Sequence, residues 1–140
     1  SAFCETNSQC PAPGGRCVIT LDGADGVLIC SDNCNLVGGS GCQVAGTGCQ
    51  LGITTANEAF TLCAPSGAGV EQALCTDSGD CAPGFACLGT TEMPPQNRCF
   101  QWCDTSSPSC NPSFPNCTAL QLPNGAPITL GATTYGACNP

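Results

Sequence analysis

The sequence predicts a small disulfide-rich, mainly β fold with little helix, built as four short β-hairpin units in two homologous halves. Three observations support this prediction. First, 16 of the 140 residues are cysteine, above the roughly 8–10% that marks a disulfide scaffold. Second, the cysteines fall into four groups of four with similar spacing. Third, only five Phe, one Trp, one Tyr and one Met are available for a hydrophobic core, so crosslinks must supply stability that burial cannot.

The repeat is clearest in the third unit, residues 75–99, whose cysteines have five, five and eleven residues between them. The first unit, 4–30, has gaps of five, six and twelve, and the second, 34–63, has gaps of seven, six and thirteen. The fourth unit, 103–138, has gaps of six, six and twenty. The pattern assigns every cysteine to a disulfide: Cys4, Cys10, Cys17, Cys30, Cys34, Cys42, Cys49, Cys63, Cys75, Cys81, Cys87, Cys99, Cys103, Cys110, Cys117 and Cys138.

A second level of repetition divides the chain into two Cys-rich halves, 1–63 and 75–140, with residues 64–74 as the linker between them. In each half, three residues separate the last cysteine of one unit from the first cysteine of the next. This repeated short gap indicates a duplicated pair of units rather than four independent modules.

Two uses of the cysteines compete. Within a unit we favour pairing of the first cysteine with the third and the second with the fourth, but eight cysteines per half allow 105 connectivities, so spacing leaves the map open. Structural zinc favours cysteines two to four residues apart. Only Cys30 with Cys34 and Cys99 with Cys103 qualify, and the chain has no histidine. A redox-active Cys-x-x-Cys pair is also missing. We therefore expect disulfides, no metal centre and no cofactor.

Turn-forming residues place the hairpins. Residues 22–26, Asp-Gly-Ala-Asp-Gly, separate two β-prone runs, and this is a strong hairpin signal because Asp and Gly tolerate positive φ. In the second unit the turn is expected around residues 55–57. In the fourth unit, residues 123–125 form the turn, and residues 128–135 are expected to be an edge strand.

Few residues are candidates for ligands or modification. Asp22 and Asp25 are weak candidates for calcium, which takes several oxygen ligands, yet the EF-hand spacing is missing and turn chemistry explains both. Asp77 and Asp80 are expected to act as loop caps for the same reason. Asn116 begins an Asn-Cys-Thr sequon for N-glycosylation, and the Thr and Ser content leaves room for O-linked glycans.

The charge balance disfavours several classes of partner. Two basic residues against ten acidic ones give a net charge of -8 and a pI near 4.1. Phosphate backbones and anionic membranes would be repelled, so we expect no nucleic-acid binding. No stretch approaches the roughly 20 apolar residues that span a bilayer, so no membrane insertion is expected either. The cysteines indicate an extracellular or cell-surface location, reached after removal of a signal peptide.

The residue types also argue against an enzyme. Without histidine or lysine, and with oxidised cysteines, general bases and nucleophiles reduce to carboxylates and hydroxyls. A glycosidase-like carboxylate pair needs two converging acids, and nothing in the sequence selects two of the ten. The aromatic side chains are candidates for a sugar-binding platform, although packing over disulfides is the use we favour for Phe85, Phe100, Trp102, Phe114 and Tyr135.

The fourth unit has the features of an assembly surface. Residues 105–140 contain no charged side chain, and an uncharged surface with an exposed edge strand is typical of a site where another chain packs. The candidate residues are Ile128, Leu130, Thr133 and Tyr135. The function we favour is an exported structural subunit that assembles with copies of itself, as a homo-oligomer or polymer, into an extracellular filament or surface layer. The alternative is a soluble extracellular binding module such as an adhesin, an inhibitor or a toxin-like ligand.

The third unit also supports a resemblance. Its loop CTDSGDCAPGFAC, with an Asp directly before the second cysteine, resembles the Cys-rich tandem repeats of secreted and surface proteins, including the Dickkopf N-terminal region and repeats of exported bacterial proteins. The same loop is more faintly similar to whey-acidic inhibitor modules, but the chain lacks their adjacent cysteine pair and basic inhibitory loop. The resemblance implies extracellular interaction modules without enzymatic activity.

Overall fold

The computed structural model describes residues 3–11, 14–21, 24–90 and 92–140. It consists of short strands and two single-turn 3₁₀ helices, in the order β1 (Phe3–Cys4), η1 (Asn7–Gln9), β2 (Cys17–Leu21), β3 (Ala24–Cys30), β4 (Thr47–Ile53), β5 (Ala59–Pro65), η2 (Ser78–Asp80), β6 (Phe85–Gly89), β7 (Asn97–Asp104), β8 (Asn116–Ala119), β9 (Thr129–Leu130) and β10 (Thr133–Asn139). The prediction of a small, mainly β fold with little helix is therefore confirmed.

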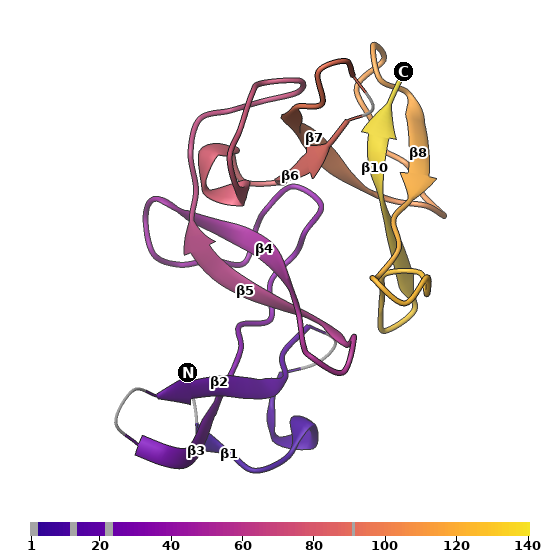
Figure 1. Cartoon of the computed structure of the whole chain (residues 1–140). Helices are drawn as coiled ribbons and strands as arrows, with labels where there is room; N and C mark the ends of the chain where they lie inside the picture. The colour runs from indigo at the N-terminus through magenta and orange to yellow at the C-terminus, as the bar shows by residue number, and fades with distance from the viewer. Residues whose placement is uncertain (1–2, 12–13, 22–23, 91) are drawn as a thin grey trace.

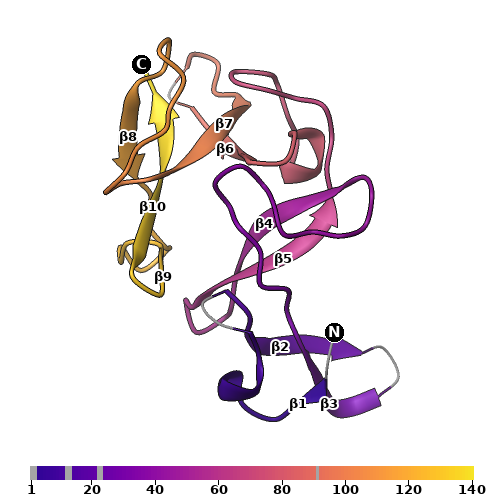
Figure 2. The same ribbon diagram turned by 180° about the vertical axis from the view of Figure 1, so that it is seen from behind.

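The strands form three antiparallel sheets that lie one above another in Figure 1. The first unit forms the sheet β1-β3-β2 at the bottom, and the second unit forms the ribbon β4-β5 in the middle. The third and fourth units share the upper sheet, in the order β6-β7-β10-β8 with β9 on β10. The view from behind in Figure 2 shows the same order, with the first unit and the upper sheet at opposite ends.

All sixteen cysteines are bonded, in eight disulfides that each stay within one unit. The first cysteine pairs with the third and the second with the fourth in every unit, which is the pairing that we favoured while the spacing left the map open. The bonds are Cys4–Cys17, Cys10–Cys30, Cys34–Cys49, Cys42–Cys63, Cys75–Cys87, Cys81–Cys99, Cys103–Cys117 and Cys110–Cys138.

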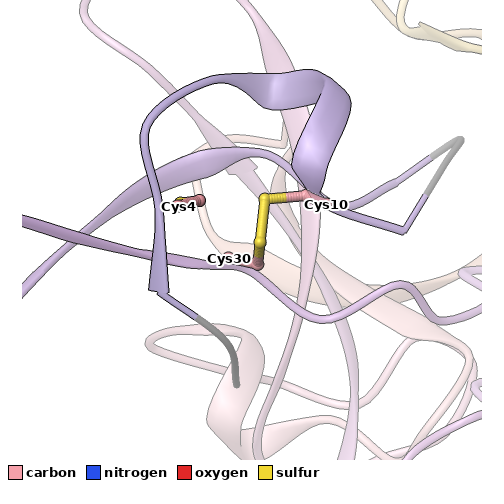
Figure 3. Close-up of side chains that lie close together, drawn as sticks. All are labelled: Cys4, Cys10 and Cys30. Carbon is pink, nitrogen blue, oxygen red and sulfur yellow. A yellow bond between two sulfur atoms is a disulfide. The ribbon is translucent and has the colours of Figure 1, made fainter.

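The hairpins explain how this pairing works. In every unit the third and fourth cysteines face each other across the hairpin, as Cys17 and Cys30 do in the first. Each is bonded to the loop that precedes the hairpin instead of to its cross-strand neighbour. Figure 3 shows the first unit, where the sulfurs of Cys4, Cys10 and Cys30 lie within 4.8 Å of one another. Two disulfides thus attach one loop to one hairpin, which compensates for a two-stranded ribbon that is marginal alone.

The apolar core does not follow the predicted division into halves. Its main cluster surrounds Trp102 and takes side chains from the second, third and fourth units, including Leu36, Ala86, Ile128 and Leu130. The first unit has a separate cluster made mainly of cysteine sulfur. The second, third and fourth units therefore share one core, which combines side chains from both sides of the predicted linker at residues 64–74. The first unit has its own cluster and does not contribute to this core.

Residues 64–74, predicted as a linker, pack against the third unit. Ala64 and Pro65 belong to β5, and Gly69 forms a bridge with Cys81. The Gln72 N–H donates to the Cys99 carbonyl at 2.8 Å, and the Cys99 N–H donates to the Ala73 carbonyl at 2.8 Å. This segment therefore adds a short length of paired backbone beside β7.

The prediction of an edge strand over residues 128–135 is wrong. These residues divide between β9 and β10, and β10 lies between β7 and β8. Ile128 and Leu130 are buried, with 3% and 4% of their surface exposed. Thr133 pairs with Leu130, and Tyr135 pairs with Asp104 on β7. Gly136 and Ala137 of β10 pair with β7 on one side and with β8 on the other, so a further strand cannot pair with β10 at these two residues.

The first unit is attached to β5 by polar groups. Arg16 donates from Nε to the Ala59 carbonyl at 2.6 Å and from Nη1 to Glu58 Oε2 at 2.9 Å. The Thr61 N–H donates to the Gly14 carbonyl at 2.9 Å, and its hydroxyl donates to the Asp32 carbonyl at 2.7 Å. Thr61 is fully buried. We call this set of residues the polar junction.

Candidate binding groove

An apolar groove opens between the second unit and the upper sheet. Its narrower part is a cavity of about 240 Å³ that β4, β6 and the fourth unit enclose. Trp102 contributes to its lining, and the larger aliphatic and aromatic side chains around it are Leu51, Ile53, Phe85, Leu88, Leu120 and Ile128. None of the described residues that line this cavity carries a charge.

A second, more open depression of about 490 Å³ continues the groove across the upper sheet. It shares Leu88 and Leu120 with the narrower part and adds Phe100, Thr118 and Ala137. The described residues of its lining are likewise uncharged. The groove therefore crosses β6, β7, β10 and β8 as one uncharged surface. We refer to both parts together as the groove.

The core behind the groove is fixed by packing. Trp102 is 4% exposed and meets Tyr135 edge to face, with ring centroids 6.4 Å apart and planes at 84°. Burial, followed by the nearby Asp104 carboxylate, raises the pKa of the Tyr135 hydroxyl. Because Trp102 is buried, its ring face is not available to stack on a sugar. The packing interpretation of the aromatic residues holds for this tryptophan.

The outer edge of β4 runs beside the groove. The bonds from Thr54 N–H to the Glu58 carbonyl and from Ser66 N–H to the Gly46 carbonyl continue the ladder with β5 at even positions. In an antiparallel ladder, the backbone N–H and C=O groups of the odd-numbered residues of β4 then point away from β5. Leu51 and Ile53 lie at such positions, and β5 is the strand paired with β4. The main chain here can accept an extended segment.

Asp77 and Asp80 occupy structural positions outside the lining of the groove. The prediction that Asp77 and Asp80 act as caps is confirmed, since Asp77 accepts from the Gly79 N–H at 2.8 Å and Asp80 accepts from the Thr76 N–H at 2.8 Å. The hydrogen bonds from Thr76 hold the pKa of Asp80 below its ordinary value. These carboxylates stabilise the loop around η2.

Two further carboxylates hold residues 71–74 against β7. Glu92 accepts from Arg98 Nε at 2.8 Å and Nη2 at 3.0 Å, and these bonds lower its pKa to about 2. Arg98 also donates to the Gln72 carbonyl at 2.8 Å. Glu71 accepts from the Gln101 N–H at 3.0 Å through Oε2, while its buried Oε1 has no hydrogen-bond partner in the described structure. Burial raises the pKa of Glu71.

The remaining candidate sites are dispersed. Asn116 is exposed at the start of β8, and Asn139 Nδ2 donates to the Thr118 hydroxyl of the same sequon at 2.7 Å. Asp22 and the side chain of Asp25 lie outside the described residues. Within the described ranges, the clusters of possible metal ligands are cysteine trios, and every sulfur in them is already bonded in a disulfide.

Sequence reasoning missed the groove. Its lining combines side chains from three units, and no local pattern marks Leu51, Leu88 and Leu120 as neighbours. The available signal was an apolar residue one or two positions after the third cysteine of the second and third units, Leu51 and Leu88. That signal predicts strand residues but not a shared surface.

Comparison with known proteins assigns no family. No family model, no curated protein and no solved structure matches the chain. Among the described residues, no helix has the length and apolar character needed to cross a membrane. The established class is a small protein stabilised by eight disulfides, a framework typical of oxidising, extracellular surroundings.

Proposed function

We propose that this protein is an exported, non-enzymatic structural subunit whose copies assemble into an extracellular filament or surface layer. The observation that carries the proposal is the groove, an uncharged apolar surface that stays open in a molecule with few large hydrophobic residues. Contiguous exposed apolar surface on a folded protein marks interaction sites. The edge strand expected at residues 128–135 plays no part in this proposal.

Other apolar side chains support an association function. Phe3 is 72% exposed, Val44 70%, Val70 57%, Leu74 63% and Met93 91%. Single exposed hydrophobic residues are ordinary. Here they occur in a chain whose core is small and whose shape is held by sulfur, so apolar side chains remain available for contact between molecules.

The charge distribution favours contact at the groove. A net charge of -8 makes two copies repel each other at most orientations. The groove and residues 105–140 carry no charge, so repulsion is weakest where the groove is covered. Added salt screens the remaining acidic residues, and assembly is therefore expected to strengthen as salt concentration rises.

Sedimentation velocity and negative-stain electron microscopy of the oxidised protein test the proposal. We expect association that increases with concentration and with sodium chloride, and regular assemblies on the grid. A monomer that persists at millimolar concentration, in both low and high salt, would overturn self-assembly.

The alternative, an extracellular binding module, rests on the same groove. Its enclosed part, about 240 Å³, is below the range of about 300–1,000 Å³ typical of small-molecule pockets. An amino-acid side chain from a macromolecule fits this size better than a metabolite. A persistent monomer would therefore direct attention to a foreign protein as the occupant.

A further inference from the structure

The first unit presents an exposed aromatic side chain on a rigid support. Phe3 is 72% exposed on β1, where it pairs with Ile29 of β3. The next residue, Cys4, is buried and bonded to Cys17. Figure 3 shows how β1 passes Cys4 directly beside the cluster of sulfurs. The backbone at Phe3 is held by the pairing of β1 with β3 and by the disulfide of Cys4, so little backbone freedom is lost when a partner covers the ring.

The groove lies elsewhere on the molecule. Figures 1 and 2 both place β1 in the lowest sheet, whereas the groove is formed by β4 and the upper sheet. Phe3 and the groove are different surfaces, so a contact in which each copy receives Phe3 from one neighbour and places its own Phe3 in another is heterologous. Repetition of a heterologous contact gives a ring or an open filament.

From these two features we infer that a second copy of this chain occupies the groove, with Phe3 of one copy inserted beside Leu51 and Leu88 of the next. The inference rests on the proposed function and names its contact. The exposed Leu51–Ile53 edge of β4 lies beside the inserted side chain, where β1 of the neighbouring copy can pair with it.

Charge and geometry select this occupant over the other exposed apolar residues. The acid nearest to Phe3 in the sequence is Glu5, two residues away, and it is exposed. It meets no like charge at the groove, because the described lining is uncharged. Met93 is more exposed but lies in the loop between β6 and β7, not on a strand. Phe3 is aromatic and directly precedes the disulfide-bonded Cys4, and aromatic side chains dominate interface energetics.

The test compares Phe3→Ser with Met93→Ser, two changes of a highly exposed apolar residue to the same polar one. Both variants must first show eight disulfides by non-reducing intact mass. In sedimentation velocity, we expect Phe3→Ser to raise the concentration needed for half association about tenfold or more, and Met93→Ser to leave it unchanged. Phe3→Ser that associates like wild type would overturn the inference while the proposed function stands. A monomeric wild type would overturn both.

A mixing experiment tests the heterologous geometry. Leu88→Glu places a charge in the groove but leaves Phe3 intact, whereas Phe3→Ser leaves the groove intact. At the concentration where half of the wild type associates, each variant alone is expected to stay mostly monomeric, and an equimolar mixture is expected to form one-to-one dimers and nothing longer. If Leu88→Glu does not form eight disulfides, Ile53→Glu replaces it, since Ile53 is 42% exposed. Monomers in the mixture, or full-length assemblies from either variant, would contradict the contact.

Discussion

The polar junction and the core around Trp102 hold similar hairpin units together by opposite means. At the polar junction, Arg16 and the buried Thr61 connect the first unit to β5 through hydrogen bonds and one ion pair. Around Trp102, three units share apolar side chains. Disulfides thus determine the shape of each unit, and the chemistry between units decides which of them unfold together.

The contrast extends to how closely the backbones approach. Between the second and third units, Gly39 has a φ of +71°, and a Cβ there would come within 2.5 Å of the Gly84 nitrogen. At the polar junction, a Cβ on Gly14 would meet the Thr61 hydroxyl oxygen. Both contacts need glycine, but the first packs backbone on backbone and the second makes room for a hydrogen-bonding side chain.

Removal of the central tryptophan should have the largest effect on the shared core. Trp102→Ala is expected to cost about 3–5 kcal/mol of unfolding free energy, as for other buried aromatic residues, because the ring is 4% exposed. Phe100→Ala, two residues earlier on β7 and partly exposed, is the control with a smaller loss. Guanidinium titration with the disulfides intact measures both. Equal losses would show that Trp102 is not the centre of the core.

Two matched disulfides separate the effect of the crosslink from that of packing. Cys4–Cys17 and Cys34–Cys49 span 13 and 15 residues, so the chain-entropy model gives about 3 kcal/mol for each. Cys34 and Cys49 belong to the shared core, whereas Cys4 belongs to the cluster of the first unit.

Replacement of both cysteines by serine in the first pair should therefore expose only the first unit to hydrogen exchange. The same change in the second pair should raise exchange across the second, third and fourth units. Hydrogen-exchange mass spectrometry distinguishes the two patterns. A loss of protection confined to one unit in both variants would mean that the shared core does not couple its three units.

A smaller effect is expected at the polar junction. Thr61→Val removes a hydroxyl that donates to the Asp32 carbonyl and accepts from the Cys34 N–H at 3.3 Å. Two buried groups lose their partner, which costs about 1–3 kcal/mol. Thr47→Val, at the start of β4, removes an exposed hydrogen bond to the Val44 carbonyl and is the matched control. Thermal unfolding of both variants checks the difference, and equal melting temperatures would argue against a structural role for the Thr61 hydroxyl.

The smallest effects concern the pH dependence of stability. Glu92 and Glu71 should change the stability in opposite directions as the pH rises. The folded-state pKa of Glu92 lies at about 2, below its ordinary 4.5. The stabilisation that the Glu92 carboxylate adds to the folded state is therefore present above pH 4.5 and is lost as the pH falls toward 2. Glu71 has a raised pKa, so the folded state binds its proton more tightly, and stability falls as the pH rises above 4.5.

Melting temperatures of Glu92→Gln and Glu71→Gln across pH 2–7 check these signs. Relative to wild type, the melting temperature of Glu92→Gln should be lowered most at neutral pH and little at pH 2. The melting temperature of Glu71→Gln should be raised at neutral pH, because a neutral amide replaces a charged carboxylate whose buried Oε1 has no hydrogen-bond partner in the described structure. Parallel pH profiles for wild type and both variants would contradict the assigned environments.

The features that follow directly from cysteine spacing could be predicted from the sequence. The four units and their hairpins follow from gaps that recur along the chain, and the pairing that we favoured within a unit is the one observed, although spacing alone left the map open. Loop caps such as Asp77 could also be predicted, because turn chemistry is local. These features depend on residues close in the sequence, where a single chain carries enough information.

Features that depend on contacts between units could not be predicted. Ile128 and Leu130 sit in an uncharged, turn-rich segment that is typical of a surface, yet long-range packing against Trp102 buries them. β10 lies inside the sheet because it pairs with β8 and with residues 102–104 of β7, which extend beyond the part of β7 that pairs with β6. The groove arises in the same way, from side chains of three units that only the assembled fold brings together.

Disulfide mapping of the native, unreduced protein tests the central claim most directly, since every unit depends on its own pair of crosslinks. Proteolysis at acidic pH, which prevents exchange, followed by mass spectrometry should recover eight links, each within one unit and each joining the first cysteine to the third or the second to the fourth. Free thiols, bound metal or a link between two units would contradict the account.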